Sequence, residues 1–99
     1  MAGRPISDRF AANLRRLRDE AGLTQEDLAF CAQIHRTQVS LMEGGERLPR
    51  FETLVRVIGA LGVDHGALFE GIAWEPPDLM RGGLRVTPAE DPADAAEEP

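Results

Sequence analysis

The residues best suited to chemistry in this chain are five neighbours between positions 36 and 41. Four of them have side chains that can hydrogen-bond to a base edge or a phosphate, and the fifth can contact the methyl group of thymine. They are Arg36, Thr37, Gln38 and Ser40, followed by Leu41. Such groups recognise a nucleic acid only when one rigid element presents them together on its outer side.

Two short helices joined by a tight turn are predicted for residues 25–43, and the second helix would present these side chains. Thr24 suits the N-cap of the first helix, with Asp27 three residues later in an arrangement close to a capping box. Apolar residues recur at helical spacing and define the buried side: Leu28, Ala29, Ala32, Ile34, Val39 and Met42. The pattern predicts a helix-turn-helix with its recognition helix at residues 36–43.

The elements around this motif predict an all-α domain of five helices over residues 1–71. A first helix is expected from a Ser7 cap to about Ala21, and a fourth over residues 50–61. Asp64 would cap a fifth helix. That last helix carries Leu68 and Phe69.

Beyond residue 71 the composition changes, and the pattern predicts a short β arm over residues 72–87. Two strands, at residues 72–74 and 84–87, would flank a connector that contains Pro-Pro and Gly-Gly. Trp74, Leu84 and Val86 lie outside the helical core in a segment too short for a stable sheet of its own. The arm therefore either packs on its own domain, dimerises, or binds another protein.

Residues 88–99 contain only Ala, Pro, Asp and Glu, which predicts a disordered acidic tail. The tail holds five of the acids, while residues 1–62 carry nine Arg against eight acids. The net charge of −6 therefore does not exclude a local basic surface for DNA. With one cysteine, no apolar run long enough for a membrane span and no secretory signal, the chain is expected to be cytoplasmic.

The chain resembles the phage repressor and Cro-like regulators of the Xre family over about residues 8–71. The resemblance rests on Leu-Thr-Gln-Glu-Asp-Leu-Ala at 23–29, Val-Ser at 39–40, Glu-Gly-Gly at 43–45 and Pro49. So do Glu-Thr-Leu at 52–54 and Ala-Leu-Gly-Val at 60–63. Residues 34–40 are also similar to the controller proteins of restriction–modification systems.

The resemblance implies roles for individual residues. Gln25 would anchor the DNA backbone, and Arg50 would meet phosphates or the minor groove. Arg18 and Glu43 would form a structural ion pair between the first and third helices. Three positions depart from the family pattern: Gln33 stands where a turn glycine is usual, His35 where a Ser or Thr cap is usual, and Phe30 where a polar residue is usual.

We therefore expect a sequence-specific DNA-binding regulator, a repressor or autoregulator, that acts as a homodimer on an inverted repeat. One alternative is an antitoxin or adaptor whose arm binds a protein partner. The other is a helix-turn-helix fold that has lost DNA binding and mediates only protein contacts. No catalytic constellation or cofactor motif is present, and Cys31 with His35 lacks the further ligands of a metal site, so neither an enzyme nor a metal protein is expected.

Overall fold

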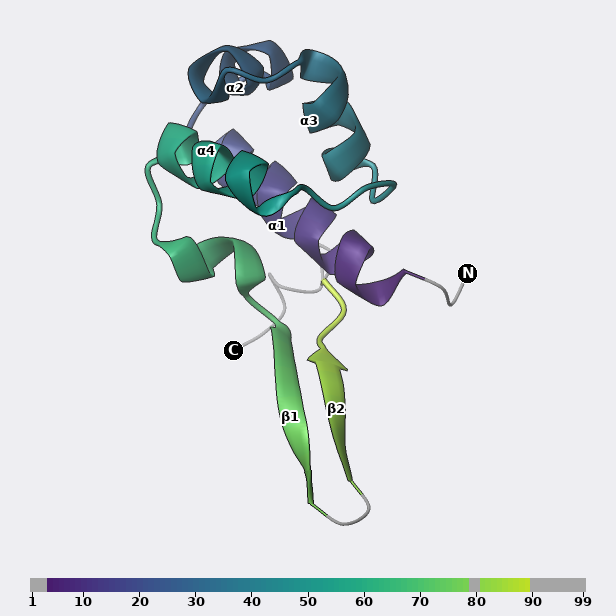
Figure 1. The fold of residues 1–99 in the computed structure, drawn as a ribbon. Helices are drawn as coiled ribbons and strands as arrows, with labels where there is room; N and C mark the ends of the chain where they lie inside the picture. Colours follow the sequence, from purple (N-terminus) through teal and green to yellow (C-terminus); the bar gives the residue numbers. More distant parts are fainter. Residues whose placement is uncertain (1–3, 79–80, 90–99) are drawn as a thin grey trace, which may run out of the picture.

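The computed structural model describes residues 4–78 and 81–89. The elements run in the order α1 (Pro5–Glu20), α2 (Gln25–Ala32), α3 (Arg36–Glu43), α4 (Phe51–Leu61), the 3-10 helix η1 (His65–Phe69), β1 (Ile72–Asp78) and β2 (Arg81–Val86). Figure 1 shows α2 and α3 at one end of the molecule and the β1–β2 hairpin projecting from the other end. Of the predicted acidic tail, residues 90–99 lie outside the described part, and residues 88 and 89 belong to no helix or strand.

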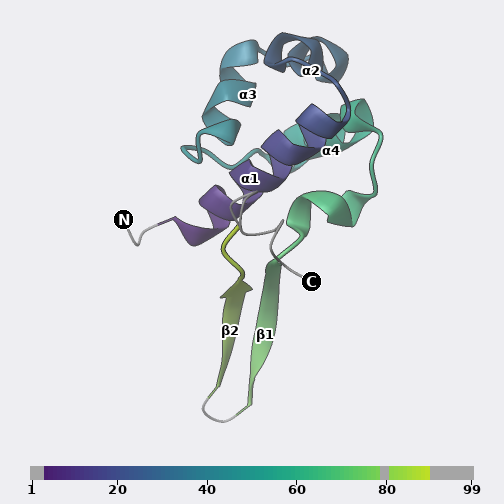
Figure 2. The ribbon, with the colours of Figure 1, turned by 180° about the vertical axis from the view of Figure 1, so that it is seen from behind.

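One apolar core joins all four α-helices and η1. Its largest fully buried members include Leu14 of α1, Leu28 of α2, Met42 of α3, Val57 of α4 and Leu68 of η1. The view from behind in Figure 2 shows α1 crossing in front of α4 through the middle of the molecule, and α1 contacts both α3 of the helix-turn-helix and β2 of the hairpin. No helix among the described residues is long and apolar enough to cross a membrane.

The prediction that Ser7 caps the first helix is wrong, because α1 begins at Pro5. The N-cap is Arg4, whose side chain makes no capping hydrogen bond, and the backbone N–H of Asp8 donates to the carbonyl of Arg4 at 2.9 Å. Proline suits this position because its fixed φ is already helical and its missing N–H would have had no intrahelical partner. Ser7 consequently lies inside the first turn.

The predicted fifth helix is a five-residue 3-10 helix, so the domain has four α-helices and one 3-10 turn. The N–H of Ala67 donates to the carbonyl of Asp64, three residues earlier, at 3.0 Å. The side chain of Asp64 makes no capping hydrogen bond. Segments this short commonly close with the tighter i→i+3 pattern.

The strands of the hairpin are longer than predicted, because both presumed breakers lie inside them. Pro76 and Pro77 belong to β1, and Gly82 and Gly83 belong to β2. A side chain at Gly82 would clash with the backbone of Pro77, 2.4 Å from its Cα, so glycine allows the close approach. Proline is tolerated here because each strand of a two-stranded sheet is an edge strand.

The turn between α2 and α3 places Gln33 in the left-handed conformation, with φ 59° and ψ 49°. The side-chain amide of Gln33 compensates in part, since Nε2 donates to the carbonyl of Phe30 at 2.8 Å. We expect Gln33→Gly to raise the free energy of unfolding by roughly 0.5–1 kcal/mol, because glycine adopts this conformation without strain. The second variant, Gln33→Ala, keeps the backbone strain and loses the side-chain hydrogen bond. Comparison of the thermal unfolding of the two variants with that of the parent therefore separates the strain from the hydrogen bond. A less stable glycine variant would show that the side-chain hydrogen bond outweighs the strain.

Candidate nucleic-acid interface

A reciprocal capping box starts α2. The backbone N–H of Asp27 donates to Thr24 Oγ1, and the backbone N–H of Thr24 donates to Asp27 Oδ2, both at 3.0 Å. The backbone hydrogen bond from Thr24, followed by the one between the two side chains, lowers the pKa of Asp27. The box sets the start of α2, and with it the direction in which the first N–H groups of the helix point.

The outer side of α3 carries the predicted recognition residues together. Its inner side is held by Val39 and Met42, which are buried in the core. Leu41 is half-buried, and the other four predicted residues are exposed: Arg36, Thr37, Gln38 and Ser40. The helix therefore presents four polar side chains to solvent, with the half-buried Leu41 among them.

The start of α3 is closed by Gln38 rather than by a side-chain cap from His35. Gln38 Oε1 accepts the backbone N–H of His35 at 3.3 Å, which is half of a capping box. The side-chain Nε2 of Gln38 remains available as a donor. This arrangement is not predicted from the sequence, because a Ser or Thr cap is the usual signal and His35 is neither.

The arginines divide into those that hold the fold together and those that do not. Within the described residues, six arginine side chains bond to other protein groups: Arg9, Arg15, Arg16, Arg18, Arg56 and Arg85. In the same part of the chain, Arg4, Arg36, Arg47 and Arg50 have no side-chain hydrogen bond or salt bridge, and all four are exposed. Arg4 precedes α1, whereas Arg36, Arg47 and Arg50 lie on or beside α3. Among the described side chains, three of the four unpaired guanidinium groups therefore lie at the recognition helix.

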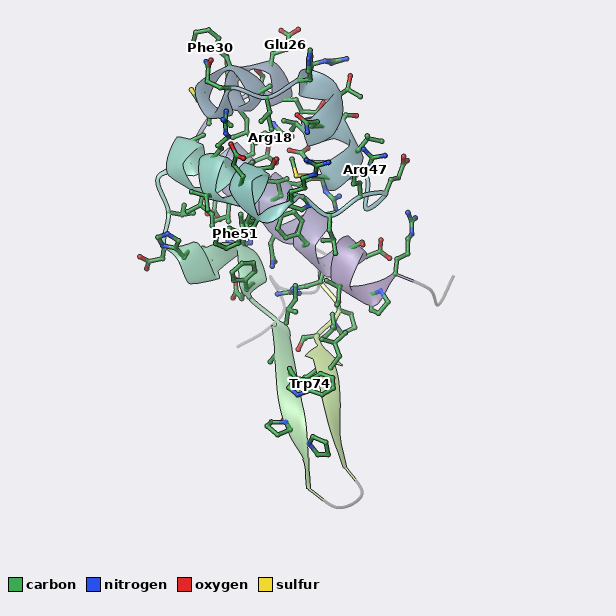
Figure 3. All side chains as sticks on the ribbon, viewed as in Figure 1. Arg18, Glu26, Phe30, Arg47, Phe51 and Trp74 are labelled. Atoms are coloured by element: carbon green, nitrogen blue, oxygen red, sulfur yellow. The ribbon has the colours of Figure 1, made fainter. Side chains whose placement is uncertain are left out.

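Arg47 and Arg50 border an open cavity of about 350 Å³ between α3 and the start of α4. The cavity is lined by Gln38, Met42, Arg47, Leu48, Pro49, Arg50 and Thr53. Figure 3 shows Arg47 beside the C-terminal end of α3. Arg47 is not among the predicted site residues, and its only signal in the sequence is its position three residues before Arg50.

The structure places Arg18 and Glu43 in a buried ion pair. Arg18 Nε and Nη2 donate to the two carboxylate oxygens of Glu43 at 2.5 and 3.0 Å. Glu43 is 5% exposed, and this hydrogen bond is the main reason why the pKa of Arg18 is raised. The pair ties α1 to the end of α3 and so holds the recognition helix at a fixed angle to the core.

Gln25 lies at the first position of α2, and its side chain points into this network. Gln25 Nε2 donates to Glu43 Oε1 at 3.0 Å, so the side-chain donor is already used inside the protein. The backbone N–H of Gln25 has no intrahelical partner, as in every first turn, and such a group can bind a phosphate. A contact with the DNA phosphates at this position therefore depends on the main-chain N–H of Gln25 rather than on its side-chain amide.

Two other features offer no site. Cys31 and His35 are exposed, and no three His, Cys, Asp or Glu residues in ranges 4–78 and 81–89 are grouped so that they could hold a metal ion. Phe30, which departs from the family pattern, is 76% exposed on the outside of α2 (Figure 3).

Comparison with known proteins identifies the class. The model of the helix-turn-helix domain family matches residues 9–70, and the chain belongs to this family. It is an Xre-like, non-enzymatic DNA-binding transcriptional regulator. Over 54 residues it is 41% identical to the HTH-type transcriptional regulator y4dJ of Sinorhizobium fredii, a match that spans 54% of this chain and 70% of the relative.

Solved structures agree with this assignment. The restriction–modification controller protein C.AhdI from Aeromonas hydrophila aligns with a TM-score of 0.62 and 33% identity, over 64% of this chain and 96% of the controller protein. The clp gene regulator ClgR from C. glutamicum aligns with a TM-score of 0.61 and 26% identity, over 66% and 84% of the two chains. The family model ends at residue 70, so the β1–β2 hairpin lies beyond it.

Proposed function

We propose that this protein is a repressor or autoregulator that binds an inverted-repeat operator as a homodimer, with α3 in the major groove. The observation that carries the proposal is the gathering of exposed Arg36, Arg47 and Arg50 around the polar side of α3. Two recognition helices in successive major grooves require half-sites about 10–10.5 base pairs apart. Selection of bound sequences from random DNA with the purified protein tests the proposal, and the expected product is a two-fold symmetric consensus.

The residues divide into those that read bases and those that position the protein. Arg36 suits guanine or a phosphate, and Gln38, with its free Nε2, suits adenine. The rest of this surface is formed by Thr37, Ser40 and Leu41. Arg47 and Arg50 would hold the DNA backbone on the α4 side, and the N–H of Gln25 would hold it on the α2 side.

We expect Gln38→Ala to relax base preference at one operator position by about 1–3 kcal/mol, because the amide reads a base edge. Arg47→Ala is expected to weaken every sequence to a similar degree and to reduce the salt dependence of binding, because the guanidinium meets a phosphate. Titration of operator variants at two salt concentrations separates these effects.

The unfolding midpoints of both variants serve as the control, since Gln38 also accepts the N–H of His35. If both folded variants bind the operator and its mutants as the parent does, the recognition surface lies elsewhere.

A second candidate function is that of an antitoxin or adaptor whose C-terminal arm binds another protein. The observation in its favour is Trp74, which is 63% exposed on the hairpin. A protein of that kind without DNA binding would give no consensus in the selection experiment.

A further inference from the structure

The β1–β2 hairpin has one apolar face and one polar face. Ile72 pairs with Val86 across the two strands, and Trp74 pairs with Leu84, so these four residues share one face, here called the apolar hairpin face. The opposite face carries a salt bridge between Glu75 and Arg85, which raises the pKa of the arginine. Ile72 and Val86, the pair next to the helical domain, are half-buried, whereas Trp74 is 63% exposed and Leu84 is 49% exposed.

Polar contacts fix the segment that leads into the hairpin, at Leu68 and Glu70, to α1. Asn13 Nδ2 lies 2.9 Å from the carbonyls of Leu68 and of Glu70, and Arg9 Nε donates to the carbonyl of Glu70 at 2.9 Å. Arg16 pairs with the carboxylate of Glu70 at 2.8 Å. The hairpin therefore projects in a defined direction, away from α2 and α3 (Figures 1 and 2).

We propose that the apolar hairpin face binds the same face of a second copy of this chain. This inference rests on the proposed function and identifies the contact surface of the proposed dimer. The charge of the segment supports a copy as the occupant. Residues 72–86 carry two acids and two arginines, so two hairpins meet without the repulsion expected from a chain of net charge −6. The exposed Trp74 is the only tryptophan of the chain, and Figure 3 shows it on the hairpin away from the helices.

The position of the hairpin decides how the two copies are arranged. Stacking of the two faces about a two-fold axis parallel to the strands leaves both recognition helices at the same end of the dimer. Antiparallel pairing of β2 with its copy would instead place the two helix-turn-helix motifs at opposite ends. Because one operator must be reached by both motifs, stacking of the faces is the arrangement that suits the proposed function.

The area of the face predicts a weak dimer. With strands about 5 Å apart and about 20 Å long, one hairpin face has an area of roughly 200 Å². Two such faces in contact therefore bury about 400 Å² in total. Stable interfaces bury about 1,200 Å² or more. Adjacent half-sites hold two copies at a high local concentration, however, and there even a weak contact produces cooperative binding.

Sedimentation and the emission of Trp74 over a wide range of protein concentration test the inference without DNA. The parent chain is expected to become a dimer at tens to hundreds of micromolar, with a parallel blue shift of the tryptophan emission. Leu84→Asp should remain a monomer with a solvent-exposed Trp74. Val55→Asp is the matched control, because Val55 is 46% exposed on α4, outside the hairpin; this variant should dimerise as the parent does.

A second variant, Trp74→Thr, retains a residue that favours strands and should also sediment as a monomer. Dimer loss in Val55→Asp with an intact dimer in Leu84→Asp would place the contact on α4 and overturn the inference, as would a parent that is monomeric throughout. Binding to an isolated half-site is read separately. Leu84→Asp should keep it and lose only cooperativity, whereas loss of half-site binding by the parent would contradict the proposed function instead.

Discussion

Replacing Glu43 by alanine is expected to lower the free energy of unfolding by about 3–5 kcal/mol, because it leaves a largely buried guanidinium without its partner. Glu43 is 5% exposed, and its carboxylate accepts two hydrogen bonds from Arg18. It also accepts one from Gln25 at 3.0 Å. Truncation therefore removes the group that joins α1, α2 and α3 at one point.

Denaturant unfolding followed by circular dichroism measures this loss. The matched control is Glu52→Ala, since Glu52 pairs with Arg56 at 3.0 Å on the exposed side of α4. An exposed helical pair of this kind is worth only about 0.3–0.5 kcal/mol. Equal losses in the two variants would show that Arg18 regains its hydration when Glu43 is removed.

The second large effect is expected at Leu68, where truncation to alanine should cost about 2–5 kcal/mol. Leu68 is fully buried, whereas the adjacent Phe69 is 41% exposed. Phe69→Ala should therefore cost much less, although it removes more atoms. Comparison of the two midpoints in denaturant decides whether η1 is an integral part of the core, and a greater loss at Phe69 would contradict the packing described here.

The helix-turn-helix could be predicted from the sequence because its signals are local. The Thr24 cap, the Asp27 partner and the spacing of the buried residues lie within one or two helical turns of each other. The first helix is present as predicted, but its predicted start is wrong, because a good cap residue at Ser7 competes with a proline two positions earlier. Proline was the stronger signal, since it fixes the backbone rather than adding one hydrogen bond.

The parts of the site that could not be predicted depend on residues far apart in the chain. The hydrogen bond from Gln25 to Glu43 joins residues 18 positions apart, and the contacts of Asn13 with Leu68 and Glu70 span more than 50 positions. No local pattern distinguishes an asparagine that will be buried from an ordinary surface residue. That the Arg47 side chain has no partner within the described residues is likewise known only from the structure, which shows the partners of the other arginines.

The way in which the hairpin is attached has a consequence for dynamics. Asn13, Arg9 and Arg16 bond to Leu68 and Glu70, just before β1, and Ile72 and Val86 of the hairpin are only half-buried, while the fully buried core residues all lie between Phe10 and Leu68. The hairpin can therefore open as a separate unit while the helical domain stays folded. In amide hydrogen exchange, β1 and β2 should lose protection well before α1 and α4. A regulator built in this way could gain or lose its arm in evolution without refolding the part that reads DNA.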